Sequence, residues 1–470
     1  MKATVTAPSS TTTVTVTRRD RIALGLLVSA QFLVMLDTSI VNVALPSIQS
    51  ELDFGPAAVT WVVNAYVLAF AGLLLLSGGA ADLFGRRRVF VVGASLFTVG
   101  TLLATVAVTK ELLILGRVVQ GIGAAGLSPA AMSLLLVTFP AAQRARAMGA
   151  WGAASTLGGA TGVVSGGVLA GTMGWRAVFL VTVPVSLAAI ALARRVLVED
   201  APGVRLTVDW AGAAAVTGAV ITLVHGAVDA VDHAWSSPRV VGLFAVSSVL
   251  MAAFIAIERR AADPLVPVEL FRSRMLRTGG AVALLGGASR ASTFVLVALY
   301  LQQVLVMSPE QAGFAMVPTS VTGFAVSVAV LPRVLGAIGP VRSMVLGLVV
   351  LAAGHLWLAN APTGSAYVVA VLPGLLLVAT GVALSFTPTT MVLTSAVPAS
   401  HTGLASGLAG ASMQVGGALG TAAFIVIGIS SGRPVEGALD AAGFSAAFTA
   451  AAVVALLTAA LGATLPRPRS

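Results

Sequence analysis

Long hydrophobic runs, separated by short polar or charged segments, follow one another along almost the whole chain. A helix needs about 20 apolar residues to cross the hydrocarbon core of a membrane. Breaks at charged clusters, at Gly and Pro turns and at polar runs divide the chain into fourteen such stretches. The predicted spans are residues 22–46, 57–79, 88–108, 112–138, 147–170, 175–197, 207–228, 238–257, 277–304, 311–332, 340–359, 366–394, 402–430 and 441–465. The pattern predicts an all-α polytopic membrane protein with fourteen transmembrane helices.

The composition agrees with this pattern and excludes a soluble protein. Of the 470 residues, 57% are hydrophobic and 9% are charged, and the mean hydropathy is +1.00. Soluble domains carry about 25% charged residues, so most of this surface is expected to face lipid. The net charge of +10 comes largely from basic residues in short loops between apolar runs. Because they form no stripe or motif, we expect membrane lipids and no nucleic acid as partners.

The sequence offers neither a metal site nor thiol chemistry. Cysteine is absent, and the four histidines, His225, His233, His355 and His401, lack the spacing of metal ligands. No phosphate-binding loop that would use ATP is present. We therefore expect no cofactor, and we interpret His355 as a core residue in preference to a proton relay.

The distribution of basic residues predicts the orientation of the spans. If the N-terminus is cytoplasmic, inside segments hold 21 of the 27 Lys and Arg residues and outside loops hold only four. Excess positive charge marks cytoplasmic loops, so both termini are predicted to be cytoplasmic. Residues 1–21, which begin rich in Thr and Ser, are predicted to form a disordered cytoplasmic tail, and residues 466–470 a second one. The first apolar run is too long for a signal peptide, whose apolar region has about 7–15 residues.

A partial internal repeat relates the fifth span to the thirteenth. Segments 149–162 and 407–420 are identical at seven of fourteen positions, mostly glycines. If the seventh and eighth spans are an insert, the thirteenth span is the fifth in a second set of six. Secondary transporters usually have duplicated halves with the substrate site between them. The predicted layout is an N-terminal six-helix bundle (22–200), two inserted helices (201–258), a cytoplasmic loop (259–276) and a C-terminal six-helix bundle (277–465).

Three motifs resemble those of the major facilitator superfamily, specifically its fourteen-helix drug:proton antiporter branch. They are LDTSIVNVALP at 36–46, GGAADLFGRRR at 78–88 and LGRVVQGIGAA at 115–125. The resemblance implies the major facilitator fold, built here from two six-helix bundles and two inserted helices. It also implies export of drugs or antibiotics against inward proton flow. The chain departs from the family pattern at Val163, where the family usually has proline.

Asp37 is the only carboxylate in the interior of a predicted span. An ionised group there costs at least about 2.5–3.5 kcal/mol, so it should be paired, hydrated or protonated. Such a group can load and release a proton as water access alternates, or it can brace a helix junction before Pro46. Arg117 is the matching charge in the fourth span. The resemblance implies that it influences proton coupling, and a structural role in binding backbone carbonyls is the alternative.

The loop between the second and third spans carries Asp82, Gly85, Arg86 and Arg87. Gly85 permits a tight turn, and Asp82 can accept bonds from arginines or from helix N-termini. The resemblance implies that these residues form a conformational latch that holds the outward-facing state closed. The alternative is a simple positively charged anchor at the membrane surface.

Glycines recur at four-residue spacing in the fifth span, with Gly158, Gly162 and Gly166 on one face and Gly167 adjacent. Glycine lets helix backbones approach each other closely. The spacing therefore predicts a smooth helix-packing surface against a neighbouring helix.

Polar residues within the spans are candidates for the wall of a substrate cavity. They are Gln31, Asn42, Asn64, Tyr66, Gln120, Arg290, Gln302, Gln303 and Gln414. The spans contain one carboxylate and two arginines, so the cavity is not expected to be acidic. The hypothesis that follows is a largely apolar substrate that is neutral, zwitterionic or anionic.

These observations predict a secondary active transporter in a bacterial inner membrane. The leading interpretation is a monomeric exporter of amphipathic small molecules such as drugs or antibiotics, which works by alternating access with protons as the coupling ion. Uptake of a small metabolite, proton-coupled or facilitative, is the alternative that Val163 leaves open. A membrane enzyme or receptor fits poorly because no nucleophile motif, metal cluster or sizeable soluble domain is present.

Overall fold

The computed structural model describes residues 17–55, 58–197, 209–261, 264, 266–361, 367–432 and 439–466. Within these ranges every regular element is helical, which confirms the predicted all-α fold class. Thirteen helical stretches of the described residues are long and apolar enough to cross a membrane. The longest, Gln311–Ala359, contains two of the predicted spans, and Gly339 with a φ of +76° breaks the helix between them. Only glycine adopts that φ at little cost, so the break makes fourteen crossings.

The first half of the chain contains seven helices that make six crossings, because α6 and α7 together form the sixth. They are α1 (Arg18–Glu51), α2 (Trp61–Phe84), α3 (Arg86–Thr105), α4 (Lys110–Thr138), α5 (Ala141–Thr172), α6 (Trp175–Leu180) and α7 (Val183–Val196). Two further helices, α8 (Trp210–Asp232) and α9 (Pro238–Glu258), follow where the insert is predicted.

The second half repeats this arrangement. It contains α10 (Arg274–Gln303), α11 (Pro309–Ala325), the π-helical turn η3 (Val326–Val330), α12 (Leu331–Ala359), α13 (Tyr367–Ala370), α14 (Leu372–Ser395), α15 (Thr402–Ser431) and α16 (Ala441–Ala463). Three short 3-10 helices lie in connections: η1 (Ala58–Thr60), η2 (Val268–Arg272) and η4 (Ala399–His401). The helices α13 and α14 share one crossing, Tyr367–Ser395.

The start of the first helix differs from the prediction. Residues 18–21 were assigned to the disordered tail, but α1 begins at Arg18. A capping box explains the difference: the Thr17 hydroxyl accepts a bond from the Asp20 backbone N–H (3.2 Å), and the Asp20 carboxylate accepts one from the Thr17 N–H (2.9 Å). These bonds satisfy two backbone donors that a helix start leaves open. Residues 1–16 and 467–470 of the predicted tails lie outside the described residues.

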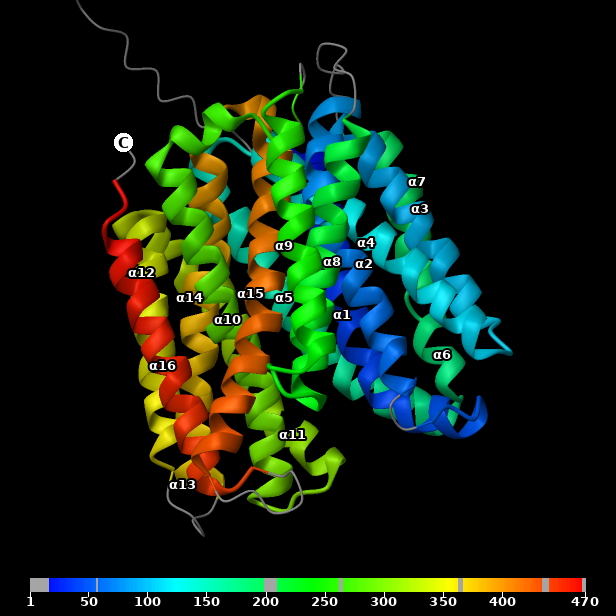
Figure 1. Ribbon diagram of the computed structural model, residues 1–470. Helices are drawn as coiled ribbons and strands as arrows, with labels where there is room; N and C mark the ends of the chain where they lie inside the picture. Colours follow the sequence, from blue (N-terminus) through cyan, green and yellow to red (C-terminus); the bar gives the residue numbers. More distant parts are fainter. Residues whose placement is uncertain are drawn as a thin grey trace, which may run out of the picture.

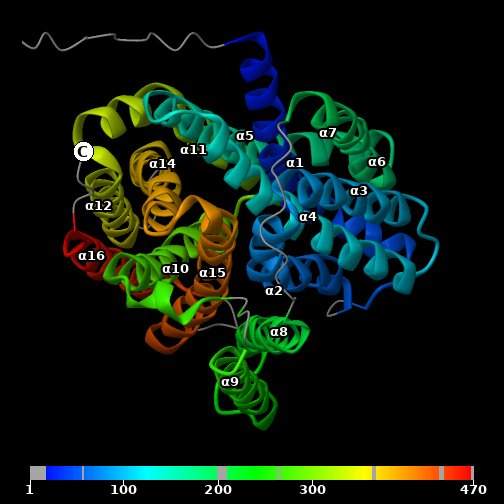
Figure 2. The ribbon, with the colours of Figure 1, turned by 90° about the horizontal axis from the view of Figure 1, so that it is seen from above.

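Each half has its own hydrophobic core. The core of the first half includes the buried aromatic residues Phe90, Phe97 and Trp151. The core of the second half includes Phe444 and Phe448. The view along the bundle shows the two groups of helices beside each other, with α8 against α2 and α15 and with α9 outside α8 (Figure 2).

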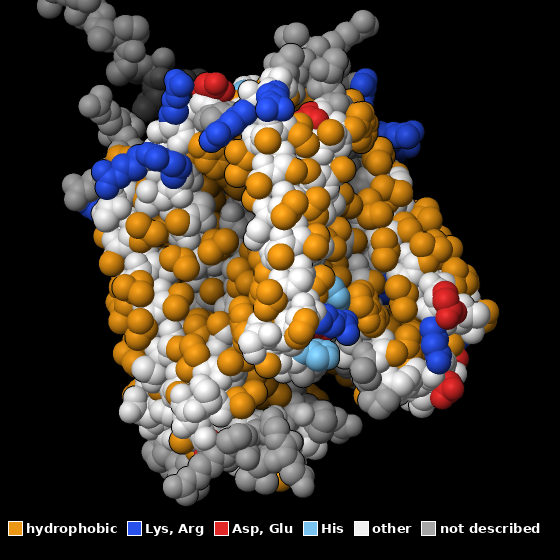
Figure 3. Space-filling view, in the orientation of Figure 1, with side chains coloured by type: hydrophobic (Ala, Val, Ile, Leu, Met, Phe, Trp, Pro, Cys, Tyr) orange, Lys and Arg blue, Asp and Glu red, His pale blue; other side chains and the backbone are white. Residues whose placement is uncertain are grey.

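The two halves meet along two seams. The helices run side by side along the bundle (Figure 1). On one side α2 packs against α15, and on the other α5 packs against α11 (Figure 2). Basic side chains gather at the end of the bundle where α16 finishes, at the top of Figure 3. This end, called the Arg-rich end below, includes the α2–α3 turn at Arg86 and the last turns of α7 and α9.

Candidate functional site

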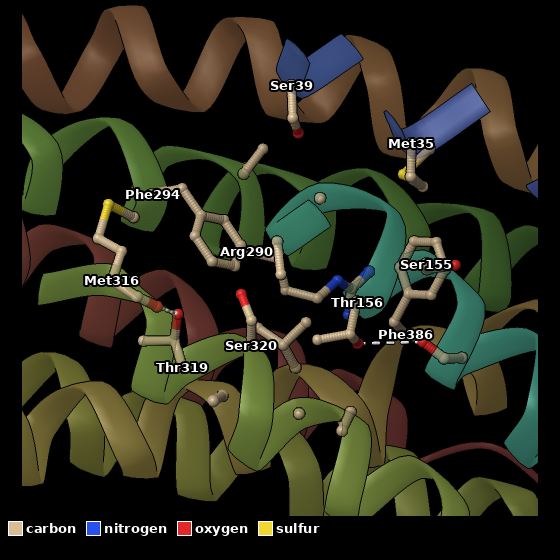
Figure 4. Close-up of a pocket in the computed structure, with 18 of the residues that line it drawn as sticks. Met35, Ser39, Ser155, Thr156, Arg290, Phe294, Met316, Thr319, Ser320 and Phe386 are labelled. Carbon is tan, nitrogen blue, oxygen red and sulfur yellow. Dashed lines mark hydrogen bonds between the residues drawn. The ribbon is translucent and has the colours of Figure 1, made fainter. Parts of the chain in front are cut away.

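A cavity of about 450 Å³ lies between the two halves, at the middle of the helices that surround it (Figure 4). The first half contributes α1 and α5, and the second contributes α10, α11, η3, α14 and α15. The lining residues are Met35, Thr38, Ser39, Gly152, Ser155, Thr156, Gly159, Ala160, Val163, Gly287, Arg290, Ala291, Phe294, Gly313, Met316, Val317, Thr319, Ser320, Gly323, Ser327, Ala379, Val382, Ala383, Phe386, Thr387, Met413 and Gln414. We call this space the central cavity.

The wall of the central cavity is mostly apolar. Met35, Phe294, Met316 and Phe386 supply large hydrophobic surfaces, and the polar groups are mainly the hydroxyls of Ser and Thr. Among the described residues that line it, Arg290 is the one charged side chain. A largely apolar pocket with few polar groups is typical of sites for small molecules.

Arg290 projects from α10 into the space that the other lining side chains surround (Figure 4). Only 4% of the residue is exposed. Its Nη1 donates a long bond of 3.3 Å to the Ser385 hydroxyl of α14, and its Nη2 has no hydrogen-bond partner. The guanidinium lies over Gly286, where a Cβ would be 2.9 Å from Nη1. The missing side chain at Gly286 therefore makes room for the cation.

The second buried charge cluster joins α1 to α4. The Asp37 carboxylate accepts a bond of 2.6 Å from Arg117 Nη1 and one of 3.1 Å from Gln120 Nε2. Asp37, Arg117 and Gln120 are all fully buried. The prediction that Asp37 is either paired, hydrated or protonated is resolved here in favour of pairing.

Arg117 keeps several partners besides Asp37. Its Nε donates to the Val62 carbonyl at 2.8 Å, and its Nη1 also donates to Gln120 Oε1 at 2.8 Å. Its guanidinium carbon lies 4.4 Å from the centre of the Tyr66 ring. Because these contacts do not depend on Asp37, the arginine would stay hydrogen-bonded if Asp37 became neutral. The alternative of bonds to backbone carbonyls, raised for Arg117, is thus present together with the ion pair.

Helix α1 connects this ion pair to the central cavity. Met35, Thr38 and Ser39 line the cavity, while Asp37 lies between them in sequence and faces α4. A shift of α1 would therefore change the ion pair and the cavity wall together.

The glycine surface of α5 packs against α1. A Cβ added to Gly158 would lie 2.6 Å from the Phe32 carbonyl oxygen. At Gly162 it would lie 2.8 Å from the Leu36 carbonyl oxygen, and at Gly166 2.9 Å from that of Ile40. Gly167 is different, because its Cβ would meet Val43 at an ordinary 3.9 Å. Three of the four predicted packing glycines thus sit at close backbone contacts.

A charged junction joins α2 to α15 at the Arg-rich end. The Asp82 carboxylate accepts backbone N–H bonds from Gly403 (3.0 Å) and Leu404 (2.8 Å), at the start of α15. Arg86 Nη2 donates to Asp82 (3.1 Å) and to the Ala399 carbonyl (2.5 Å). A carboxylate at a helix N-terminus is stabilised by the helix dipole. We call these contacts the α2–α15 latch.

The other predicted members of the latch have separate roles. Gly85 has a φ of +95° and forms the turn between α2 and α3, which requires glycine. Arg87 is half-buried at the start of α3, on the same turn. On α2, Gly78 lets the two helices approach, since a Cβ there would lie 3.0 Å from the Gly407 Cα.

Two of the nine predicted cavity residues, Arg290 and Gln414, line the central cavity. Gln31 lies just behind the wall, where it donates to the Ser155 hydroxyl at 3.0 Å. Tyr66 and Gln120 belong to the surroundings of Arg117. The side chains of Gln31 and Gln120 therefore serve hydrogen bonds between helices of one half, and the Tyr66 ring serves a contact with Arg117.

The remaining predictions for the cavity wall need correction. Asn42 is exposed and bonds to the Thr38 carbonyl of its own helix, and Gln302 does the same with Ala298. Gln303 accepts a bond from the Leu439 N–H at the far end of α10. Asn64 is half-buried on α2 and outside the lining. Asn42 and Gln302 bond within their own helices and Gln303 bonds at a helix end, which sequence position alone does not reveal.

Sequence reasoning missed most of the cavity wall. Thr38, Ser39, Thr156, Phe294 and Phe386 are small-hydroxyl or aromatic residues of a kind found throughout the spans. It also missed the latch partners on α15, which present backbone N–H groups and no distinctive side chain. The glycine surface and the two buried arginines were the usable signals.

The chain is similar to known proteins over most of its length. The family model of the Major Facilitator Superfamily matches residues 27–421. The cephamycin export protein of Amycolatopsis lactamdurans is 37% identical over 420 residues, which cover 88% of this chain and 86% of that protein. The puromycin resistance protein of Streptomyces alboniger is 35% identical over 85% of this chain and 80% of its own length.

A solved structure shows the same fold at low sequence identity. The crystal structure of the human organic anion transporter MFSD10 aligns with a TM-score of 0.69, covering 95% of this chain and 100% of that one. Its sequence is 16% identical, so this likeness concerns the fold alone. Together with the family match, it confirms the architecture that the three motifs predicted.

Proposed function

This chain belongs to the major facilitator superfamily, and we propose that it exports amphipathic small molecules of the drug or antibiotic type by proton antiport. The central cavity carries the proposal: it lies between the two halves, at mid-depth, with a mostly apolar wall. The relatives named for cephamycin export and puromycin resistance support this class of substrate. The family and the named relatives consist of transporters, which agrees with a role other than catalysis.

The two seams between the halves support alternating access as the proposed mechanism. The α2–α15 latch closes the Arg-rich end through the bonds of Asp82 to Gly403 and Leu404. Opening of the latch would let the halves rock about the central cavity and expose it at that end. The cavity wall is shared between the halves, so a bound molecule would be released as they separate.

We assign the coupling of protons to Asp37. Capture of a proton by its carboxylate would neutralise the charge that binds Arg117 Nη1. Arg117 would keep its bonds to the Val62 carbonyl and to Gln120, so its guanidinium would still have hydrogen-bond partners. Because the ion pair that joins α1 to α4 would be weaker, α1 could shift. The cavity residues Met35, Thr38 and Ser39 would move with it. Loss of the proton to the cytoplasm would restore the pair.

The proposal places the protein in a bacterial inner membrane with both termini in the cytoplasm. The Arg-rich end would then be the cytoplasmic end, in accord with the excess of positive charge on that side. The coupling ion is the proton, and no other cofactor is required. The partners are the small-molecule substrate and membrane lipids, and a single chain contains the complete cavity, so we propose a monomer.

Transport into proteoliposomes tests this function. Inside-out vesicles with an acidic lumen reproduce the direction of export, because protons leave the lumen as substrate enters. The probes are dansylphenylalanine, its uncharged amide, and the amine dansylcadaverine. We expect at least one of them to accumulate with wild-type protein beyond the passive level of protein-free vesicles.

The Asp37→Asn variant is expected to lose this gradient-driven accumulation while still folding. Glu51→Gln is the matched control, since Glu51 is a carboxylate of the same helix that pairs with Arg176 near the helix end. Equal accumulation by wild type and Asp37→Asn would remove Asp37 from the mechanism. Movement of the probe out of the vesicle lumen with the protons would instead support uptake.

A further inference from the structure

We propose that Arg290 is the recognition site for a negatively charged group, and that the substrate is an amphipathic monoanion such as a carboxylate. This deepens the export function proposed above and rests on it. The anionic group would bind the guanidinium, and the apolar body of the substrate would lie against the hydrophobic wall of the central cavity.

The charge of the cavity is unbalanced. Arginine stays protonated in proteins, so Arg290 brings one full positive charge into a buried site. The described residues that line the central cavity include no Asp or Glu. The nearby buried carboxylate Asp37 is held by Arg117 and Gln120. A buried charge without a counter-charge is unfavourable, and an anion entering the cavity would relieve it.

The free hydrogen-bonding capacity points the same way. Nη2 of Arg290 is buried without a partner, and the one bond of Nη1 to Ser385 is long at 3.3 Å. The hydroxyls of Ser327 and Thr387, which also belong to the cavity wall, are buried without partners as well. A carboxylate accepts several hydrogen bonds at once and could use such donors.

A purely structural role accounts poorly for Arg290. Arg117, which is buried as well, has bonds to a carboxylate, a backbone carbonyl and an amide, and an aromatic ring beneath it. Arg290 has one bond to a neutral hydroxyl. A guanidinium that serves packing alone is expected to have hydrogen-bond partners within the protein. The unpaired donor of Arg290 instead fits a ligand that binds and dissociates.

The surrounding wall indicates what the rest of the substrate is like. Phe294 on α10, Met316 on α11, Phe386 on α14 and Met35 on α1 offer aromatic and thioether surfaces. These surfaces bind apolar bodies, and methionine adapts to different shapes. A cationic drug would meet the uncompensated charge of Arg290 in a site of low dielectric, so cations would be disfavoured.

Binding to purified protein in an uncharged detergent tests the assignment directly. The probes are again dansylphenylalanine, its amide and dansylcadaverine, which share one fluorophore and differ in charge. We expect wild type to prefer the carboxylate. In Arg290→Gln, we expect binding of the carboxylate to weaken about 10- to 100-fold, while binding of the amide stays within about twofold. Retained binding of the amide shows that the cavity is folded.

Two further variants make the result specific. Arg290→Lys keeps the charge and should keep the preference for the carboxylate. Lys110→Gln removes one positive charge far from the cavity, beside Phe54, and should change nothing. The proposal is overturned if wild type does not bind the carboxylate, if it binds the amide or the amine equally well, or if Arg290→Gln preserves the preference.

The vesicle assay separates this inference from the proposed function. Weak acids are passively excluded from an acidic lumen, so accumulation of dansylphenylalanine there requires export by the protein. A carboxylate preference in binding without any gradient-driven transport would refute the export function and leave the Arg290 site intact. Gradient-driven export of the amine or amide, with no preference for the carboxylate, would refute the Arg290 site and leave export intact.

Discussion

The two halves of the molecule treat buried charge in opposite ways. In the first half, Asp37 of α1 and Arg117 of α4 form an ion pair of 2.6 Å that is closed off from the central cavity. In the second half, the corresponding helices are α10 and α14, the first and fourth of their set. There Arg290 has one long bond to Ser385 and faces the cavity.

The register of the repeat sharpens this contrast. Gly162 of α5 packs against Leu36 of α1, and Gly420 of α15 packs against Ala288 of α10. These contacts align Asp37 with Ser289, whose hydroxyl donates to the Ala451 carbonyl at 3.0 Å. They also align the cavity residue Thr38 with Arg290. The same helix arrangement thus holds a paired charge in the first half and an unpaired charge in the second.

The difference shows that two halves with similar helix packing can use their buried charges for different purposes. A paired charge changes its partners when a proton arrives, so it suits conformational coupling. An unpaired charge at the cavity wall acquires a partner only when a ligand arrives, so it suits recognition. The packing that supports the two is alike, because glycines of the fifth helix in each half contact the first helix.

The largest expected effect comes from breaking the ion pair. Arg117→Met leaves the Asp37 charge buried without its cation, and we expect the free energy of unfolding to fall by about 3–5 kcal/mol. Denaturation of the purified protein in one detergent measures the loss. The same substitution in the second half, Arg290→Met, removes an unpaired cation and should cause no loss. An equal loss in both variants would contradict the contrast between the halves.

A second test concerns the α2–α15 latch, which joins the two halves and takes its carboxylate, Asp82, from the end of α2 in the first half. The equivalent junction of the second half, residues 326–342, contains two arginines and no carboxylate. Asp82→Asn removes the charge that binds the two N–H groups of α15. We expect the closed state to weaken, so that a probe in the α2–α15 seam becomes accessible about tenfold faster.

The absence of native cysteine makes this measurement simple. Ser406→Cys places a single thiol at a buried position of α15, next to Gly407, which packs against α2, and a membrane-impermeant maleimide reports its exposure. Asp209→Asn is the matched control, since Asp209 caps α8 through the Gly212 N–H and does not join the halves. Unchanged labelling in Asp82→Asn, or an equal increase in the control, would contradict the role of the latch.

Smaller effects are expected at the glycine contacts, where the halves should behave alike. Gly162→Ala introduces a Cβ 2.7 Å from that of Ser39, and Gly420→Ala one 2.5 Å from that of Ala288. We expect each to reduce the free energy of unfolding by about 1–3 kcal/mol because helices must move apart. If only one half responds, the shared packing inferred from the repeat is wrong.

The smallest effect is predicted for Gly167→Ala. Its Cβ would meet only Val43, at 3.9 Å, so the change should stay within about 0.5 kcal/mol. Measured beside Gly162→Ala, it separates the effect of close helix contact from the general preference of helices for alanine. A loss as large as that of Gly162→Ala would show that the close helix contact at Gly162 is not what makes that position sensitive to an added Cβ.

Much of the fold could be predicted from the sequence because a membrane helix is a local object. Its length, its apolar composition and its charged ends depend on consecutive residues alone. In α2, for example, the apolar run that begins at Trp61 ends at the charged turn near Arg86. The glycine spacing of α5 likewise indicated a packing face from one helix alone. Partner choice could not be predicted in this way, since Asp37 and Arg117 are separated by 79 intervening positions.

The amino-acid sequence by itself determined that the chain is built of long apolar helices suited to a membrane, where its basic residues lie between them, and that segments 149–162 and 407–420 resemble each other. These properties depend on hydrophobicity and charge along short stretches. Only the tertiary structure decided that Arg117 is paired while Arg290 is open, and that Gln302 and Gln303 lie away from the cavity although they are polar. The physical reason is that burial and partnership depend on how each helix is rotated and which helices pack beside it. Those rotations are set jointly by many weak contacts from distant parts of the chain.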